Sequence, residues 1–358
     1  MLSEAWKKLQ NGSDIRGVAM EGVEGEQVNL TPDIAEKIAC AFATWLARKK
    51  DKPFHELRIS VGNDSRVSGP VLRAAVIKGL TAMGCGVYNF NLASTPAMFM
   101  STVMPGYEYD GAVMLTASHL PFNRNGLKFF TCEGGLEKKD ITELLELAEA
   151  GEFQFSQQKG TVSEVDFISV YAADLVDKIR KGAADPDDFM QPLKGLRIIV
   201  DAGNGAGGFF VEKVLKPLGA DTTGSQFLEP DGSFPNHIPN PEDKTAMESI
   251  RKAVLDNNAD FGIIFDTDVD RAGAVDKNGK EINRNRIIAL MSSIVLEEHP
   301  GSVIVTDSIT SDELKLFIEE KLGGVHHRFK RGYKNVINEA IRLNNIGQEC
   351  HLAIETSG

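Results

Sequence analysis

The sequence predicts an α/β protein with three successive, related α/β domains whose mixed sheets are mainly parallel. Apolar segments of strand length alternate with amphipathic segments of helix length along the 358 residues. This alternation is typical of βαβ units, in which neighbouring strands run parallel. The pattern also restarts twice, and a chain of this length has room for two or three domains of ~100–200 residues each.

The first domain is expected over residues 1–190. Its strands are expected at the short apolar runs LRISVG (57–62), GVYNFN (86–91), GAVMLTA (111–117) and LKFFT (127–131). Helices are expected at 71–84, an amphipathic run that ends in glycine, and at 136–150, which carries charged residues on its outer face. Residues 181–195 are rich in Pro, Gly and Asp and are interpreted as a linker.

The second domain is expected over residues 191–299 and the third over 300–358. Their strands are expected at LRIIVDA (196–202), FGIIF (261–265), AGAVD (272–276), SVIVTD (302–307), HHRFK (326–330) and CHLAIE (350–355). Their helices are expected at 207–219, 284–299, 311–324 and 332–343.

Each domain repeats one plan, in which an apolar strand leads into a polar loop. The three loops are TASHLPFNRNG (116–126), DTDVDR (266–271) and ETSG (355–358). Ligands bind at the carboxyl ends of strands in open α/β sheets, so these loops are the candidate functional segments. Because the sequence stops within the third loop, the third domain is expected to be incomplete.

Composition excludes several classes of function. The net charge of −12 disfavours a nucleic-acid surface, which needs clustered Lys and Arg. The longest apolar runs are shorter than the ~18 residues of a membrane span, and the first residues lack the apolar core of a signal peptide. None of Cys40, Cys85, Cys132 and Cys350 forms a CxxC pair, which favours free thiols in a reducing, cytoplasmic compartment. We therefore expect no nucleic-acid or membrane partner.

The second loop predicts a metal site. Asp266, Asp268 and Asp270 stand at alternate positions directly after an apolar strand, and close carboxylates repel each other unless a cation lies among them. Oxygen ligands of this kind suit Mg²⁺ or Ca²⁺. An EF-hand is excluded, because its sixth and twelfth positions would be Arg271 and Lys277 instead of Gly and Glu. Three carboxylates do not fill an octahedral shell, so a further oxygen ligand is expected.

The first loop contains Ser118 and His119 side by side. A serine hydrolase is disfavoured, because the chain has no GxSxG motif and neighbouring residues at a strand end usually point in different directions. A serine that carries a phosphoryl group would instead need a metal and nearby cations, and Lys128 on the return strand is a candidate. The aspartate loop could supply that metal.

A glycine-rich turn leaves a second function open. Gly203, Gly205 and Gly208 match GxGxxG after a strand, and Glu229 follows where a ribose-binding acid could lie. The alternative is therefore a dinucleotide-dependent oxidoreductase. A lone GxGxxG is a weak signal, because the same glycines can serve as a tight strand-to-helix turn.

Several motifs together resemble one known family, the α-D-phosphohexomutases, and within it phosphoglucomutase/phosphomannomutase. They are NGSDIRG (11–17), TASHLPFNRNGLKF (116–129), DAGNGAGG (201–208), DTDVDR (266–271) and ETSG (355–358). The resemblance implies three related α/β domains and a smaller fourth domain, which would be missing from this chain. It implies that hexose 1-phosphate and hexose 6-phosphate interconvert through a phosphoserine and a hexose 1,6-bisphosphate. A non-catalytic sugar-phosphate-binding relative remains a further alternative.

The resemblance also implies roles for individual residues. The implied metal ligands for one Mg²⁺ per chain are a phosphoserine oxygen of Ser118 with Asp266, Asp268 and Asp270. The implied catalytic residues are Ser118, His119, Lys128 and Arg16. The implied substrate-binding residues are Arg271, Lys330, Glu355 and Ser357, with Arg271 also on phosphoserine oxygens and Glu355 and Ser357 on sugar hydroxyls. Two positions depart from the family pattern, Leu120 in place of asparagine and Tyr333 in place of the histidine of some relatives.

Overall fold

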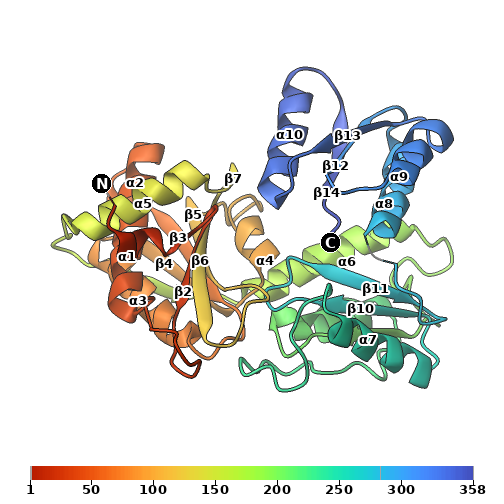
Figure 1. Ribbon diagram of the computed structural model, residues 1–358, viewed down its shortest axis with the longest axis horizontal. Helices are drawn as coiled ribbons and strands as arrows, with labels where there is room; N and C mark the ends of the chain where they lie inside the picture. Colours follow the sequence, from red (N-terminus) through yellow and green to blue (C-terminus); the bar gives the residue numbers. More distant parts are fainter. Residues whose placement is uncertain (1, 283, 358) are drawn as a thin grey trace.

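The computed structural model describes residues 2–282 and 284–357, and these residues form three sheets in chain order. Figure 1 shows helices packed against each sheet, with the first unit in red to yellow, the second in green to cyan and the third in blue. The first two sheets contain both parallel and antiparallel neighbours, and the third is parallel. The predicted fold class, successive α/β domains with mixed and mainly parallel sheets, is confirmed.

The first sheet is buried on both faces. In sheet order its strands are β1 (Gln10–Asn11), β2 (Asp14–Val18), β6 (Arg124–Thr131), β5 (Gly111–Leu115), β3 (Arg58–Asn63), β4 (Gly86–Leu92) and β8 (Val162–Glu164), with β7 (Gly134–Gly135) paired to β6. Side chains of β5 alternate between two cores, with Val113 and Leu115 in one and Ala112 and Met114 in the other. Burial on both faces explains the continuous apolar runs in the sequence.

Helices cover the first sheet from both sides. One core contains α2 (Pro32–Lys50), α3 (Gly69–Ala82) and α5 (Lys138–Ala150), and the other contains α4 (Thr95–Met100). The short α1 (Glu4–Lys7) contacts α5, and η1 (Phe54–Glu56) contacts α2. Sequence reasoning did not assign α2, although Thr31 caps it by accepting from the N–H of Ile34 and Pro32 occupies its first turn.

The second unit is a smaller sheet between two helical layers. Its strands are β11 (Ala272–Asp276), β10 (Phe261–Phe265) and β9 (Ile198–Asp201), in sheet order. α7 (Lys244–Asp256) covers one face, and η2 (Ala206–Gly208), η3 (Val211–Leu215) and η4 (Lys216–Leu218) cover the other. A single helix was expected at 207–219, but the segment is broken into short turns near Pro217, which has no N–H to donate.

The third unit contains only parallel strand pairs among its described residues. Its strands are β13 (Val325–Phe329), β12 (Val303–Asp307) and β14 (Cys350–Ile354), in sheet order. α10 (Tyr333–Asn345) packs on one face. The other face carries α8 (Asn285–Glu298), α9 (Asp312–Leu316) and η5 (Phe317–Lys321).

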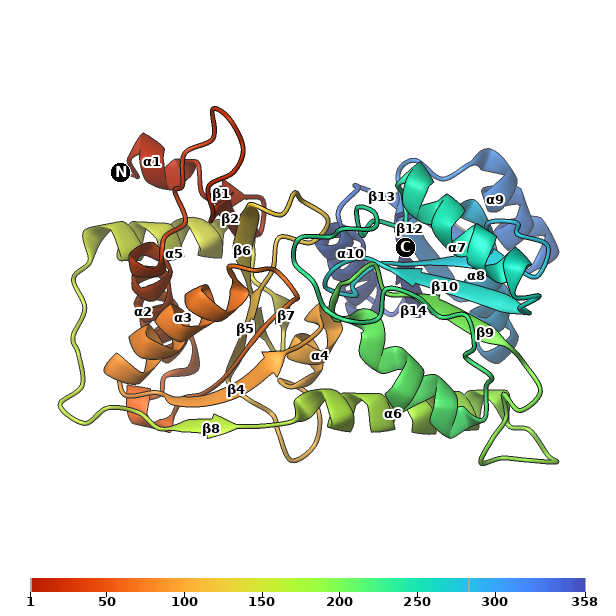
Figure 2. The same cartoon turned by 90° about the horizontal axis from the view of Figure 1, so that it is seen from below.

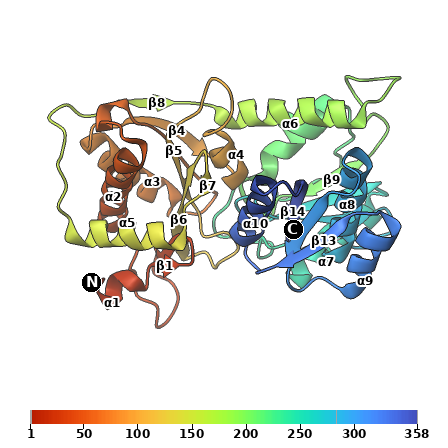
Figure 3. The same cartoon turned by 90° about the horizontal axis from the view of Figure 1, so that it is seen from above.

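Two helices that precede the expected domain boundaries, at residues 190 and 299, pack on the unit that follows each boundary. α6 (Phe167–Ala183) packs through Phe167 on the first unit and through Val176 on Val214 of the second, so it bridges the two units. Figures 2 and 3 show α6 continuing from β8 and lying along the second unit. α8, which was expected in the second domain, packs through Ile288 on Ile304 of the third sheet. A helix belongs to the unit that buries its apolar face, which sequence order alone does not reveal.

The first two units meet at the carboxyl ends of their strands. The N–H of Thr95, at the start of α4, donates to the carbonyl of Asp268 in the loop after β10 at 2.8 Å. The loops after β3 and β5 lie at the same edge, because β3 and β5 are parallel neighbours. The third unit approaches through α10, near β7 (Figure 1). Among the described residues, no helix is both long and apolar enough to span a membrane.

Candidate active site

Three aspartates of the loop after β10 converge on one point. One carboxylate oxygen from each of Asp266, Asp268 and Asp270 lies within 4.8 Å of the other two. Asp266 and Asp268 are fully buried, and Asp270 is at the surface. Val269, between the last two, has a φ of 64°, an unusual conformation for a β-branched residue. The turn at Val269 brings alternate side chains to one side.

Lys128 supplies a cation to this cluster. It lies on β6, and its Nζ is 2.8 Å from Asp268 Oδ2 and 2.6 Å from Asp270 Oδ2. Burial alone would lower the pKa of Lys128, but the attraction of the two carboxylates outweighs burial and raises it above its usual range. The side chain is therefore a buried ammonium, which meets the requirement for a cation among close carboxylates.

The aspartates differ in their proton affinity. Burial, with repulsion from Asp268 and Asp270, raises the pKa of Asp266 well above its usual range. Burial acts in the same direction on Asp268, but the ion pair with Lys128 and a hydrogen bond from Thr95 Oγ1 (2.6 Å) lower its pKa overall. The cluster thus combines the ionised carboxylate of Asp268 with that of Asp266, whose ionisation is unfavourable unless a further cation binds.

The donor set fits a hard divalent cation. All three candidate ligands are carboxylates, which Mg²⁺ and Ca²⁺ prefer. Asp268 Oδ1 is buried and has no hydrogen-bond partner among the described residues. A buried acceptor without a partner is unfavourable, and coordination to a cation would satisfy it.

Ser118 lies against this cluster although it is 148 residues away in sequence. Its Oγ donates to Asp266 Oδ2 at 2.9 Å, and its side chain is buried. Ser118 has a φ of 52°, in the left-handed region that costs a non-glycine residue about 1–2 kcal/mol. Its N–H donates to Thr116 Oγ1 at 2.9 Å. The strand end therefore exposes the serine hydroxyl to the acidic loop of the second unit.

His119 contacts the serine, contrary to the expectation that neighbouring side chains would point apart. Its Nδ1 lies 3.3 Å from Ser118 Oγ and 3.1 Å from Nη1 of Arg271. The alternation rule holds for extended backbone, and Ser118 is not extended. Burial, with the positive charges of Arg271 and Arg16, lowers the pKa of His119. Because Arg271 can only donate, Nδ1 is an acceptor in a neutral imidazole.

Arg16 also lies near the site, on β2 beside β6. Its Nη2 donates to Asp14 Oδ2 at 2.9 Å, and its backbone pairs with Gly126 of β6. Its Nε is buried and without a partner among the described residues. The guanidinium thus keeps an unused donor, and its charge helps to lower the pKa of His119.

A cavity of about 400 Å³ lies beside the aspartates, between the first and third units. Its lining includes Asp270 and Arg271 from the second unit and Glu355 and Ser357 from the third. Glu355 is half-buried and accepts from the N–H of Gly332 at 2.6 Å, and burial raises its pKa. The structure thus brings the third polar loop (355–358) close to the aspartate loop (266–271). Gly358, the last residue of the third loop, lies outside the described residues.

Lys330 is placed differently from the other candidates. It is exposed at the end of β13 and is not among the residues that line the cavity. Its loop continues through Gly332, the donor to Glu355. Lys330 is therefore near the cavity in sequence but does not reach it in this structure.

In the glycine-rich turn after β9, the space beside Gly205 and Gly208 is occupied by the protein's own backbone. A Cβ on Gly205 would lie 2.7 Å from the carbonyl oxygen of Thr267, and one on Gly208 would lie 2.2 Å from that of Leu228. Gly203 has a φ of 53°, as a tight turn requires. Gly205 allows the backbone to approach the aspartate loop (266–271) closely, and Ala206 N–H donates to the carbonyl of Thr267 there. The dinucleotide interpretation is therefore not favoured.

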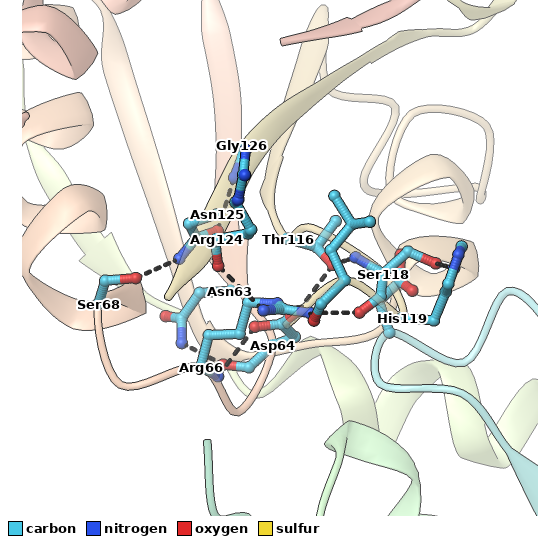
Figure 4. Close-up of polar contacts among 12 residues, drawn as sticks. Asn63, Asp64, Arg66, Ser68, Thr116, Ser118, His119, Arg124, Asn125 and Gly126 are labelled. Carbon is cyan, nitrogen blue, oxygen red and sulfur yellow. Dashed lines mark hydrogen bonds and ion pairs between the residues drawn. The ribbon is translucent and has the colours of Figure 1, made fainter. Parts of the chain in front are cut away.

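Sequence reasoning missed three residues of this region. Thr95 donates to Asp268, and Asp64 and Arg66 follow β3 and reach the Ser118 loop (Figure 4). The signal that could have found the last two is the rule used for the other loops. NDSR (63–66) also follows a buried strand, and polar residues there belong at the ligand-binding edge.

A second group of possible metal ligands lies on the third unit, at His299, Glu349 and His351. The two imidazoles stack with centroids 3.6 Å apart and planes within 16°. A ring nitrogen presents its lone pair in the ring plane. Two nearly parallel rings therefore cannot both direct a lone pair at one ion ~2.0–2.1 Å away. The geometry of His299, Glu349 and His351 is therefore unsuited to binding one metal ion.

Two family models match the chain over most of its length. Phosphoglucomutase/phosphomannomutase, alpha/beta/alpha domain I, matches residues 7–155, and domain II of the same family matches residues 174–279. The second match begins within α6, in agreement with the packing of that helix on the second unit.

Curated relatives show the same similarity. Phosphoglucomutase of Neisseria meningitidis is 33% identical over 311 residues, which are 87% of this chain and 62% of the relative. Phosphoglucomutase/phosphomannomutase of Thermococcus kodakarensis is 33% identical over 313 residues, 86% of this chain and 63% of the relative. The chain thus spans about three fifths of the length of these relatives.

A solved structure agrees with the fold. A phosphoglucomutase/phosphomannomutase family protein from Burkholderia thailandensis aligns with a TM-score of 0.79 and 26% identity. The alignment covers 100% of this chain and 72% of that protein.

Proposed function

Because the chain belongs to the phosphoglucomutase/phosphomannomutase family, we propose that it interconverts hexose 1-phosphate and hexose 6-phosphate. Ser118 carries the phosphoryl group, and a hexose 1,6-bisphosphate is the intermediate. The observation that carries the proposal is the 2.9 Å contact of Ser118 Oγ with Asp266 Oδ2, across 148 residues of sequence. A serine that served only as a turn residue would not need to meet a buried acidic cluster of another unit.

The metal would be held by this chain's own oxygens. Asp266, Asp268 and Asp270, with a phosphoryl oxygen on Ser118, are proposed to bind one Mg²⁺ per chain. When bound, Mg²⁺ neutralises charge on the phosphoryl group during transfer. Lys128 pairs with two of these carboxylates, those of Asp268 and Asp270. Once released from them, its ammonium can contact the phosphoryl oxygens.

His119 is proposed to carry the proton. A sugar hydroxyl attacks the phosphorus of phosphoserine, and the bond from phosphorus to Ser118 Oγ breaks as the new bond to the sugar oxygen forms. The hydroxyl proton passes through the neutral His119 imidazole, 3.3 Å from Ser118 Oγ, to the serine oxygen. Arg16 and Arg271 would hold the phosphoryl oxygens, a task suited to guanidinium. The return step after the bisphosphate reorients is the reverse transfer from its other phosphate.

The cavity between the first and third units is proposed to bind the sugar. Glu355 and Ser357 would accept and donate hydrogen bonds to sugar hydroxyls, and Arg271 would meet the phosphate between them and the aspartates. Lys330 is exposed and does not reach this cavity, so it would contact the substrate only if its loop moved. Positioning of this kind is the main contribution a protein makes to phosphoryl transfer.

A coupled assay tests the proposal. Glucose 1-phosphate and mannose 1-phosphate are supplied separately with Mg²⁺ and the matching 1,6-bisphosphate, and formation of each 6-phosphate is followed. We expect turnover of one or both substrates by the wild-type chain and none by Ser118→Ala. Equal turnover by Ser118→Ala would refute the phosphoserine. Saturable bisphosphate binding without any turnover would support the non-catalytic alternative, and saturable NADH binding would support the oxidoreductase.

A further inference from the structure

Arg66 is the largest fully buried side chain among the described residues. It lies in the turn that joins β3 to α3, at the carboxyl edge of the first sheet. A guanidinium is always charged at neutral pH, and a buried charge is unfavourable unless its donors are used. The partners of Arg66 therefore indicate why a cation is buried at this position.

All the carbonyl partners of its terminal nitrogens come from one segment, residues 118–124. Nη1 donates to the carbonyls of Pro121 at 2.7 Å and Arg124 at 2.9 Å. Nη2 donates to the carbonyls of Ser118 at 2.5 Å and Leu120 at 2.6 Å. Figure 4 shows these bonds converging on the guanidinium. The planar fork of arginine can bind such a set of acceptors, and the single ammonium of lysine cannot reproduce it.

Asp64 extends the contact to the other side of the serine. Its Oδ1 accepts from the Arg66 N–H at 2.9 Å, and its Oδ2 lies 3.4 Å from Arg66 Nε. Asp64 Oδ2 also accepts from Thr116 Oγ1 at 2.7 Å. Thr116 Oγ1 in turn accepts from the Ser118 N–H at 2.9 Å. Both backbone polar groups of Ser118 are therefore tied to the Asp64–Arg66 turn, its carbonyl directly and its N–H through Thr116.

The serine needs such support because its backbone is strained. Ser118 has a φ of 52°, and residues in this region keep it only when their surroundings impose it. In this conformation Oγ lies 2.9 Å from Asp266 and 3.3 Å from His119. Relaxation to an extended backbone would redirect the hydroxyl away from both.

The second unit closes over the same arginine. The ring of Phe234 lies over the guanidinium, 5.3 Å from Cζ to the ring centroid. A Cβ on Gly232 would lie 2.4 Å from Val67 N, 2.6 Å from Ser65 O and 2.7 Å from Arg66 Cα, so this backbone packs tightly on the turn. The unit that carries the aspartates is thus docked directly on the residue that holds the serine loop.

We propose that Arg66 is a positioning residue for phosphoryl transfer, which holds residues 118–124 so that Ser118 faces the aspartates of the second unit. The expected effect of Arg66 on catalysis rests on the proposed function. Its hydrogen bonds to residues 118–124 do not depend on whether the chain is active. Leu120 contributes to this holding through its carbonyl, not its side chain.

The test uses the full chain with Arg66→Lys, which keeps the charge and removes the fork. We expect kcat to fall about 100-fold, as for a displaced reacting group, with KM changed much less. Phosphorylation of Ser118 by bisphosphate should slow in parallel. Arg73→Lys is the matched control, because Arg73 bonds Asn63 of the same unit and does not touch the loop. It should behave as wild type.

Hydrogen exchange gives a readout that is independent of turnover. The amides of Ser118, Leu120 and Arg124 are bonded within the loop, and in Arg66→Lys they should exchange about tenfold faster while the β3 and β5 amides stay protected. Calorimetric Mg²⁺ affinity should stay within twofold, which a generally misfolded variant would not achieve.

A second variant covers the case in which Arg66→Lys does not fold. Thr116→Val keeps the shape of the side chain and removes the hydrogen bond to the Ser118 N–H. It should show the same lower kcat, slower Ser118 phosphorylation and faster loop exchange as Arg66→Lys, but to a smaller extent. Unchanged loop exchange and an unchanged rate of Ser118 phosphorylation in both folded variants would overturn the inference. An inactive wild-type chain whose loop is loosened by Arg66→Lys would overturn the proposed function and leave Arg66 as the holder of the loop.

Discussion

At the scale of single residues, the site is defined by competition between cations for the same carboxylates. Lys128 already pairs with Asp268 and Asp270, and a divalent ion would need oxygens from both. Asp266 has no ammonium within ion-pair distance among the described residues, and its oxygens accept from the Ser118 hydroxyl and the Arg271 N–H. The charge state of the cluster therefore determines how strongly it attracts the metal.

Two substitutions should change Mg²⁺ affinity in opposite directions. Asp268→Asn removes a charged ligand and should weaken binding at least tenfold. Lys128→Met removes the competing ammonium at similar length and should strengthen binding several-fold. Isothermal calorimetry on the metal-free proteins measures both constants. A Lys128→Met protein that binds more weakly than wild type would contradict the competition.

The stabilisation given by Mg²⁺ should increase with pH. Burial and two neighbouring carboxylates raise the folded pKa of Asp266 above its unfolded value, so its contribution to stability is present at low pH and is lost as pH rises through the folded pKa. Mg²⁺ binds the ionised carboxylate of Asp266 and so offsets the loss of folding stability that its ionisation causes. The rise in Tm on adding Mg²⁺ should therefore be larger near pH 8 than near pH 5. Asp266→Asn, which cannot ionise, should lose most of this pH dependence.

At the scale of elements, the metal loop is supported by the glycine-rich turn. A Cβ on Gly205 would lie 2.7 Å from the Thr267 carbonyl oxygen and 2.9 Å from its Cα. The backbone of Gly205 has a φ of −83°, which alanine adopts without strain. Close contact alone therefore requires glycine at this position.

Gly205→Ala should displace the metal loop. We expect a tenfold or greater loss of Mg²⁺ affinity and of kcat, because the reacting groups must be held in position. Gly182→Ala in α6 is the control, since a Cβ there meets nothing within 4 Å. A Gly205→Ala protein with wild-type affinity and turnover would show that the loop is not held by this contact.

The elements also show what sequence reasoning could predict. Strands β5 and β10 and the aspartate loop follow from apolar runs that end in polar residues, because this pattern is local. The role of Arg66 was missed, because it depends on β3 lying beside β5, a pairing between residues about 50 positions apart. The packing of α8 on the third sheet, and of α6 on the second unit, could not be predicted for a similar reason, since the core that buries a helix is set by tertiary packing.

At the scale of the whole molecule, the third unit is held against the first near the cavity. Lys334 of α10 bonds the carbonyl of Gly135 and lies 3.1 Å from Glu137, and Asn338 Nδ2 donates to Glu137 Oε1 at 2.9 Å. These polar contacts join the first and third units at the cavity that Glu355 and Asp270 line. The metal loop itself is anchored between the first two units by Thr95.

Loosening the contact between α10 and residues 135–137 should weaken sugar-phosphate binding more than Mg²⁺ binding. Lys334→Gln should raise KM for the hexose phosphate several-fold and leave Mg²⁺ affinity unchanged, because the metal ligands lie outside the contact. Lys315→Gln, on α9 of the same unit and away from the first, is the control and should leave both constants unchanged. Equal loss of metal affinity in Lys334→Gln would mean that the third unit also shapes the metal site.

The phosphoryl group on Ser118 is the claim on which the whole account depends, and intact mass spectrometry measures it most directly. The chain is incubated with glucose 1,6-bisphosphate and Mg²⁺, freed of ligand and weighed, with Ser118→Ala treated in parallel. We predict a gain of ~80 Da, one phosphoryl group, in the wild-type chain and none in Ser118→Ala. Fragmentation should place the added mass within residues 116–126. No gain in the wild-type chain, or the same gain in Ser118→Ala, would contradict the account.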